Sequence, residues 1–257
     1  MDVREEKPMV MGVVESHSLR HGLYPELAGT RVLITGLEPG HGVDIARAFA
    51  NVGSALVLQT PRMRPELEVL LEVLAGSAAD IHVTSEEILD AETALKFAQS
   101  AVQAFGGVDV VVNLARLTAE GIAADASEND IEDRVARALR GPLNITRVVA
   151  NRMAVTWVPG LVLNIVTQPL PRSPAEALLG AMARGALAAL TRTEAGNWAD
   201  QAVRINAVVP AAGAGPHEGL ASEPEIAALA LHLASKRGKG LSGLVFDAAA
   251  IPAHGCC

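Results

Sequence analysis

The sequence predicts a doubly wound α/β fold, in which helices cover both faces of a seven-stranded parallel sheet. Short apolar runs alternate with amphipathic stretches from residue 30 to residue 248, as in successive strand–helix–strand units. Half of the 257 residues are hydrophobic but only 3% are aromatic, so small aliphatic side chains must fill the core, which suits a buried parallel sheet. A glycine-rich turn follows the first apolar run.

Each element is justified by its local pattern. The expected strands are apolar runs bounded by turn residues, at 30–36, 55–60, 79–84, 108–115, 160–167, 202–210 and 243–248. The expected helices carry apolar residues at helical spacing, at 44–53, 64–76, 85–106, 127–155, 176–196 and 223–235. Ser85 is expected to cap the third helix, Gly141–Pro142 to bend or interrupt the fourth, and the sixth to start near Pro224.

One domain is expected over residues 27–257, after an N-terminal extension of residues 1–26, because no linker, repeat or low-complexity block interrupts the alternation. The formal charge of −8 disfavours nucleic acid as a partner. No apolar run is long enough to span a bilayer, and no secretory signal precedes the fold, so we expect a cytoplasmic protein. Cys256 and Cys257 are expected to be free thiols, and no metal site is expected.

The stretch Ile34–Gly42 joins the first strand to the first helix and holds Gly36, Gly40 and Gly42. Glycines there let the backbone turn tightly and approach a ligand. The helix N-terminus that follows favours a pyrophosphate. A strand before the turn and a helix after it are the context in which such a turn binds a dinucleotide.

With its turn Thr-Gly-x-x-x-Gly-x-Gly, from Thr35 to Gly42, the chain resembles the short-chain dehydrogenase/reductase family. Asp109–Ala115 resembles the family's strand-four motif, Asn-Asn-Ala-Gly, and keeps its first Asn and its Ala. The segments 203–211 and 223–248 also resemble the corresponding family segments. The resemblance covers residues 27–250 and implies a Rossmann-type sheet and nicotinamide-dependent oxidoreductase chemistry.

The cofactor positions depart from the family pattern. Glu38 puts a negative charge inside the turn, and Gln59 ends the second strand where the family has an acid or a base for the adenosine ribose. His82 stands for an Asp near adenine, while Leu114 and Arg116 replace the last Asn and the Gly of the strand-four motif. We therefore expect a vestigial glycine turn and no cofactor bound by this chain, with functional dinucleotide binding as the alternative.

The resemblance also implies a catalytic Asn, Ser, Tyr and Lys, and all four matched positions are changed. They hold Ala138, Thr167, Gly180 and Arg184. Glycine has no proton to give and arginine stays charged, so the hydride step lacks its acid, a loss of roughly 10²–10⁴-fold. Tyr24, the only tyrosine, lies in the N-terminal extension and cannot substitute.

Other groups near the cleft offer alternatives. His41 in the turn and His217 after the sixth strand are expected to face solvent, although either could face the cleft. Thr167 with Arg184 could bind an acidic ligand, against an exposed arginine or a structural salt bridge.

These observations predict a non-catalytic subunit that pairs with an active paralogue. Family members pair through two long helices, and the second is rich in alanine and glycine between residues 177 and 189, although the same residues could pack it on its own sheet. The chain resembles non-catalytic subunits of NAD-dependent hydroxyacyl-CoA dehydrogenases, which implies a heterotetramer with NAD in the active partner. The alternatives are a regulatory protein that binds a small molecule and a self-sufficient oxidoreductase with rebuilt chemistry.

Overall fold

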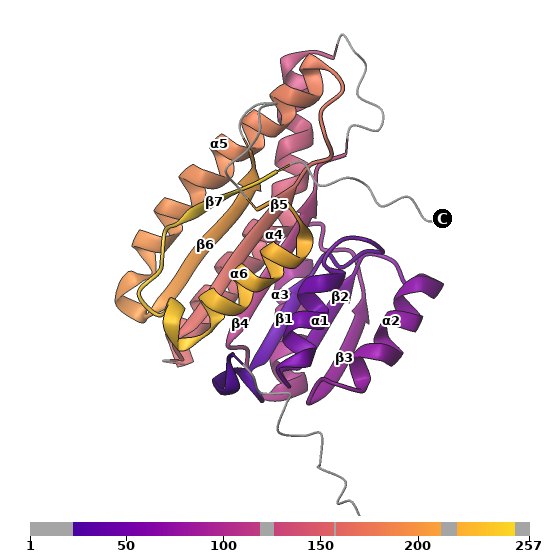
Figure 1. Ribbon diagram of the computed structural model, residues 1–257. Helices are drawn as coiled ribbons and strands as arrows, with labels where there is room; N and C mark the ends of the chain where they lie inside the picture. Colours follow the sequence, from indigo (N-terminus) through magenta and orange to yellow (C-terminus); the bar gives the residue numbers. More distant parts are fainter. Residues whose placement is uncertain (1–22, 119–125, 157, 212–219, 250–257) are drawn as a thin grey trace, which may run out of the picture.

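The computed structural model describes residues 23–118, 126–156, 158–211 and 220–249. Seven strands form one parallel sheet in the order β3-β2-β1-β4-β5-β6-β7 (Figure 1), as predicted. They are β1 (Arg31–Thr35), β2 (Ala55–Thr60), β3 (Asp80–Ser85), β4 (Val110–Arg116), β5 (Gly160–Thr167), β6 (Val203–Pro210) and β7 (Val245–Ala248). The strand order reverses between β1 and β4, which defines a switch point at their carboxyl ends.

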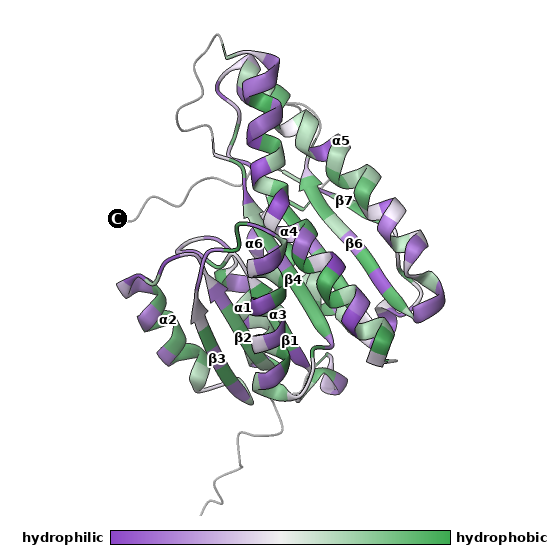
Figure 2. Ribbon diagram, turned by 180° about the vertical axis from the view of Figure 1, so that it is seen from behind, coloured by the Kyte–Doolittle hydropathy of each residue, from purple (hydrophilic) through white to green (hydrophobic). Residues whose placement is uncertain are grey.

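Helices cover both faces of the sheet. They are α1 (Val43–Asn51), α2 (Pro65–Ala75), α3 (Ala91–Phe105), α4 (Glu128–Thr156), α5 (Pro174–Asn197) and α6 (Glu223–Ala234). Helices α1, α2 and α6 pack on one face, and α3, α4 and α5 on the other (Figure 1). Figure 2 shows mostly apolar strands beneath helices banded with polar residues. This arrangement follows from the sequence patterns, because a strand buried on both faces reads as a continuous apolar run.

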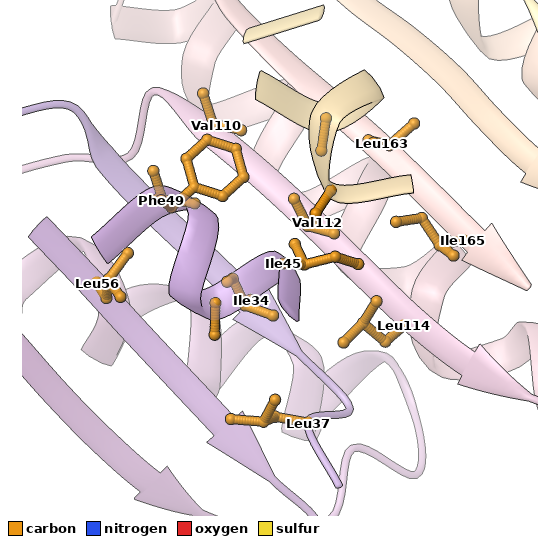
Figure 3. Packing of buried hydrophobic residues seen from close by; sticks show 14 of the residues in the cluster. Ile34, Leu37, Ile45, Phe49, Leu56, Val110, Val112, Leu114, Leu163 and Ile165 are labelled. Carbon is orange, nitrogen blue, oxygen red and sulfur yellow. The ribbon is translucent and has the colours of Figure 1, made fainter. Parts of the chain in front are cut away.

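Alternate residues of one strand serve the two halves of the core. In β1, Ile34 packs with Ile45 and Phe49 of α1, whereas Leu33 faces the layer of α3 and α4. Figure 3 shows the α1 side of this core, where Val112 of β4 joins the same cluster. The burial of β1 and β4 on both faces fixes their register, and so fixes where their carboxyl ends open onto the cleft.

The third helix begins later than predicted. Ser85 is the last residue of β3, and its hydroxyl accepts a hydrogen bond from the backbone N–H of Met63. The cap is Asp90, whose carboxylate accepts from the N–H of Thr93, while the Thr93 hydroxyl accepts from the N–H of Asp90. The expectation for Ser85 was wrong because two capping signals follow one another and the reciprocal one at Asp90 starts the helix.

The fourth helix runs through Gly141 and Pro142 without interruption, so of the two predicted outcomes, a bend or an interruption, the interruption is wrong. Pro142 is buried, and its carbonyl accepts hydrogen bonds from Thr146 in the next turn and from Asn113 of β4. The bond from Asn113 is a tertiary contact and the bond from Thr146 lies within the helix, and both hold Pro142 in place although proline has no N–H to donate to the preceding turn.

Several predictions concern residues that the structure does not describe. Most of the N-terminal extension, His217 and the two cysteines lie outside the described residues. The single-domain assignment for residues 27–257 stays a prediction. Within the described ranges, no helix is long and apolar enough to cross a membrane, and no group of His, Cys, Asp or Glu could hold a metal ion.

Candidate functional site

A pocket of about 350 Å³ lies at the switch point between β1 and β4. Parallel α/β sheets place ligands at this edge, outside the carboxyl ends of the strands. Residues from the glycine turn, from the ends of β2 and β4 and from α4 line it: Thr35, Gly36, Glu38, His41, Gln59, Pro61, Ile88, Leu114, Ala115, Arg116, Thr118, Arg137, Ala138, Gly141 and Pro142. The pocket therefore lies where the sequence predicted a dinucleotide cleft.

Two glycines of the turn are required by packing alone. Gly36 has φ 73°, and a Cβ atom there would lie 2.2 Å from the backbone oxygen of Leu114. Gly42 has φ 85°, and its Cβ atom would lie 2.1 Å from the Leu114 side chain. Gly40 has φ 72° but faces open space. The approach of the turn to β4 thus gives Gly36 and Gly42 a structural cause that needs no ligand.

The backbone donors of the turn are largely engaged within the protein. The N–H of Gly36 donates to the side-chain oxygen of Gln59 at 2.7 Å, and the N–H of Leu37 donates to the Gln59 carbonyl at 3.0 Å. Glu38 and His41 exchange two backbone hydrogen bonds, at 2.9 and 3.1 Å, that close the turn on itself. Four N–H groups that a phosphate would otherwise attract therefore have protein acceptors.

Gln59 is turned into the fold and away from any ribose position. Its side chain is 2% exposed, with the oxygen on Gly36 and the amide nitrogen donating to the carbonyl of Glu86. His82 lies in the middle of β3, within the strand predicted at 79–84, where it pairs in register with Val57 and does not line the pocket.

The N-terminus of α1 holds a carboxylate of this same chain. Glu223, the first residue of α6, accepts a hydrogen bond from the backbone N–H of Asp44 at 2.8 Å. A helix N-terminus attracts anions through its free N–H groups and its dipole. The Glu223 carboxylate therefore lies at the helix end that would face the pyrophosphate in a functional dinucleotide site.

His41 and Thr167 meet at the catalytic end of the cleft. Thr167 ends β5, and its hydroxyl oxygen lies 3.1 Å from Nε2 of His41. Each residue is 6% exposed, so the expectation that His41 faces solvent is wrong. Burial, with the nearby charge of Arg116, lowers the pKa of His41 to about 4. The imidazole is therefore neutral at pH 7.

Gln168 fills the space in front of Gly180. A Cβ atom on Gly180 would lie 2.0 Å from the side-chain oxygen of Gln168, whose amide nitrogen donates to the carbonyl of Glu176 at 2.6 Å. Both Gln168 and Gly180 are buried. Sequence comparison with the family motif missed Gln168. The available signal was Gly180 itself, because a lost side chain in a packed protein leaves room that a neighbour fills.

Arg184 is a structural residue in this fold. Its guanidinium donates to the carbonyl of Pro210 at 3.2 Å and forms a salt bridge with Asp247, which ties α5 to β6 and β7. Thr167 bonds to His41 instead, so the hydrogen bonds of Thr167 and Arg184 go to different partners. The salt-bridge alternative for Arg184 is therefore confirmed.

The remaining predicted positions are placed as follows. Ala138 lines the pocket from α4 with a side chain that has no polar atom. Tyr24 lies before the first short 3₁₀ helix, with its ring 5.7 Å from the Arg237 guanidinium. It packs at the periphery of the cluster that contains α1 and α6, and it does not line the pocket.

Comparisons with known proteins agree with this geometry. The short chain dehydrogenase family model matches residues 30–222. "Oxidoreductase UcpA" of Escherichia coli K12 is 28% identical over 186 residues, which cover 72% of this chain and 70% of that protein. Bovine L-xylulose reductase is 26% identical over 184 residues, 72% of each chain.

Solved structures share the fold. A short-chain dehydrogenase/reductase from Serratia marcescens superposes with a TM-score of 0.69 at 20% identity, covering 87% of this chain and 98% of its own. The citronellol catabolism dehydrogenase of Pseudomonas aeruginosa PAO1 gives 0.70 at 24% identity, covering 87% and 94%. The family match over residues 30–222 and the common fold together show that this chain belongs to the short-chain dehydrogenase family.

Proposed function

We propose that this chain is a non-catalytic short-chain dehydrogenase subunit that pairs with an active paralogue in an oxidoreductase complex. The observation that carries the proposal is the content of the catalytic end of the cleft. Gly180 stands at the tyrosine position, and the Gln168 side chain occupies the room that a side chain there would need. Arg184 at the lysine position is engaged by Asp247.

The groups that do face this end are poor proton donors. Hydride transfer to a carbonyl needs a proton at the new alkoxide. The imidazole of His41 has a pKa of about 4, so its acidic, charged form is scarce at neutral pH. The hydroxyl of Thr167 is engaged with that imidazole, and an aliphatic hydroxyl is a far weaker acid than the phenol that it would have to replace. This argues against a self-sufficient oxidoreductase with rebuilt chemistry.

The cofactor cleft does not fit a dinucleotide. The N–H groups of the turn have protein acceptors, and the carboxylate of Glu223 lies at the N-terminus of α1. Glu38 puts a negative charge on the part of the pocket wall that the glycine turn forms, where a pyrophosphate would lie. We therefore assign NAD to the active partner, and the glycine turn of this chain serves the packing of β1 against β4.

The outer face of α4 and α5 supports the pairing. Four small residues of α5 are spaced four apart and all are exposed: Ala177, Ala181, Gly185 and Ala189. Gly180 and Ala183 are buried instead, so the small residues of this helix serve two faces. A neighbouring groove of about 430 Å³ between the helices is lined by apolar side chains that include Leu143, Met182, Ala186 and Leu190.

A ridge of small residues lets a second helix approach closely, and an apolar groove beside it offers surface to bury. We propose that the equivalent helices of the paralogue pack here, in a heterotetramer of two subunits of each kind built on two-fold symmetry. The family's paired long helices supply the precedent for this arrangement.

The substrate that we propose rests on a resemblance to one hetero-oligomeric dehydrogenase. With these four catalytic positions changed, this chain resembles the non-catalytic subunit of the 2-(hydroxybenzyl)succinyl-CoA dehydrogenase of anaerobic toluene degradation. We therefore propose an NAD-dependent oxidation of a 3-hydroxyacyl-CoA thioester, with 2-(hydroxybenzyl)succinyl-CoA as the candidate. The active partner would do the chemistry, and this chain would stabilise it.

The test is co-expression of this chain with the paralogue that keeps an intact Tyr-x-x-x-Lys motif. We expect the two to co-purify, and NADH fluorescence titration to show saturable binding by the complex and none by the isolated chain. Replacing the partner's catalytic tyrosine with phenylalanine should abolish turnover of the hydroxyacyl-CoA, whereas Thr167→Val and His41→Leu in this chain should preserve it. Turnover or saturable NADH binding by the isolated chain would contradict the proposal.

A further inference from the structure

The cleft at the carboxyl ends of the strands has a buried part and a pocket. His41, Thr167 and Gln168 are buried beside the start of α5. The pocket of about 350 Å³ remains between the turn, the end of β4 and α4. Its walls carry the apolar surfaces of Pro61, Ile88, Leu114, Ala115, Ala138 and Pro142. Polar and apolar groups contribute about equally to the lining, and a concave pocket that combines an apolar surface with convergent polar groups is a usual form of small-molecule site.

Two guanidinium groups line this pocket. Arg116 ends β4, and Arg137 comes from the first half of α4. Among the described residues, neither forms an ion pair with a carboxylate, and Nε of Arg137 donates a hydrogen bond to the carbonyl of Asp133. Among the described residues of the lining, Glu38 is the only one with an acidic side chain, so this part of the pocket wall has more positive than negative charge.

The charge of Arg116 acts on the imidazole of His41 inside the cleft. It is the second cause, after burial, of the lowered pKa of His41, which lines the same pocket. His41 is also kept neutral by this arrangement, so it adds no positive charge of its own at pH 7. The positive charge available to a ligand therefore resides in the two arginines, which come from different elements and face the same space.

We propose that this pocket binds a small organic oxyanion, whose single carboxylate or phosphate head is held by Arg116 and Arg137 and whose apolar body lies against Leu114 and Ile88. Guanidinium groups bind both kinds of head through paired hydrogen bonds. A volume of about 350 Å³ is at the small end of ligand pockets, which suits one ring or short chain and not a dinucleotide. The inference goes beyond the proposed function and does not depend on it.

The test titrates the purified full-length chain with phenyl phosphate and with benzoate at constant ionic strength, by calorimetry and by thermal shift. Benzyl alcohol is the neutral control, and inorganic phosphate is the control without an apolar body. We expect at least one of the two aromatic anions to bind and raise Tm, with affinity at least tenfold above inorganic phosphate and with no binding of benzyl alcohol. The two probes distinguish a phosphate head from a carboxylate head.

Variants locate the site. Arg116→Met and Arg137→Met should each weaken binding at least tenfold, and Arg116→Lys should recover part of the loss because it restores the charge without the planar fork. Arg152→Met is the matched control, because Arg152 is exposed on the same helix, 15 residues or about 22 Å beyond Arg137. If Arg116→Met fails to fold, Arg137→Met tests the site alone.

Three results would overturn the inference. They are the absence of binding by both aromatic anions at millimolar concentration, equal affinity for inorganic phosphate, and unchanged affinity in both Arg116→Met and Arg137→Met. None of these results would contradict the proposed function. That proposal would be contradicted by NADH binding or turnover in the isolated chain. The two proposals can therefore fail separately.

Discussion

At the residue scale, the burial of His41 ties stability to pH. The imidazole is 6% exposed, and its pKa in the folded chain is about 4, below the ordinary value of 6.5. Between these two values the unfolded chain binds more protons, so the free energy of unfolding rises with pH. This contribution is fully present above about pH 6.5 and is lost as the pH falls towards 4, by roughly 3 kcal/mol in all.

We expect His41→Leu to flatten this part of the pH dependence. Urea denaturation at pH 4.5, 5.5, 6.5 and 7.5 measures it, and the difference between wild type and variant isolates His41 from the carboxylates that also titrate. His82→Leu, on the exposed part of β3, is the matched control and should follow the wild type. A variant whose slope between pH 4.5 and 6.5 equals that of the wild type would show that His41 is not buried as a neutral group.

Glu223 joins two helices at the edge of the cleft. Its carboxylate accepts the N–H of Asp44, which is otherwise an unpaired donor in the first turn of α1. We expect Glu223→Ala to lower the free energy of unfolding by about 1 kcal/mol, as for loss of a helix cap. Glu223→Gln should lose less, because the amide oxygen can still accept. Thermal and urea denaturation measure both, and equal losses in the two variants would contradict a role as acceptor.

The sequence predicted the site by comparison with the family motif, which aligned Gly180 and Arg184 with the tyrosine and lysine positions. The contacts that these parts of the chain make are tertiary, and the motif does not contain them. Glu223 reaches Asp44 across 179 residues, and Gln168 is recognised only by the room it fills beside Gly180. No local sequence pattern predicts such contacts, because the residues that form them are far apart in the chain.

At the scale of elements, two glycines of the turn allow the cost of a steric clash to be measured apart from the cost of a left-handed backbone conformation. Gly36 and Gly40 have φ values of 73° and 72°, but only Gly36 faces a neighbour, the Leu114 carbonyl. We expect Gly40→Ala to cost about 1–2 kcal/mol, the price of a left-handed residue with a Cβ atom. Gly36→Ala should cost at least about 3 kcal/mol or prevent folding, because a backbone oxygen cannot move aside.

Urea denaturation of the two variants gives the comparison, and circular dichroism reports whether Gly36→Ala folds. Because the two glycines share one turn and one backbone conformation, each is the other's control. Equal losses of stability would show that the close approach of the turn to β4 does not constrain Gly36, and that the glycines are kept for their φ angles alone.

Elements bounded by clear signals were predicted most closely. The strands β2 and β5 have the predicted bounds, because continuous apolar runs end at turn residues on both sides. The prediction failed at α3 and α4. Competing caps at Ser85 and Asp90 shifted the start of α3 by six residues, and tertiary bonds carried α4 through Pro142.

At the scale of the whole molecule, the layered architecture was predictable because it depends on few rules. Alternating strands and helices require parallel strands with right-handed crossovers, and apolar runs require cover on both faces. The two-sided use of α5 was not predictable. Small residues occur around the helix, and only the structure assigns Ala183 to the sheet and Ala181 to the exposed surface.

The exposed small residues of α5 give the sharpest test of the proposed pairing with the paralogue. Gly185 lies on the exposed ridge of α5, and a Cβ atom there meets nothing within 4 Å. Glutamate is also a better helix former than glycine, by about 0.5–1 kcal/mol, so Gly185→Glu should leave the isolated chain as stable as the wild type or slightly more so. In the complex, the same substitution would place a charge and a long side chain between closely packed helices.

We therefore expect Gly185→Glu to abolish co-purification with the paralogue while Tm of the isolated chain stays the same or rises. Light scattering after size exclusion chromatography measures the loss of the heterotetramer. Val69→Glu, an equally drastic change on the exposed side of α2, should leave assembly intact. If Gly185→Glu still assembles, the partner does not pack on this ridge. If its Tm falls, the ridge is part of the fold of the chain itself, and the separation of the two faces of α5 is wrong.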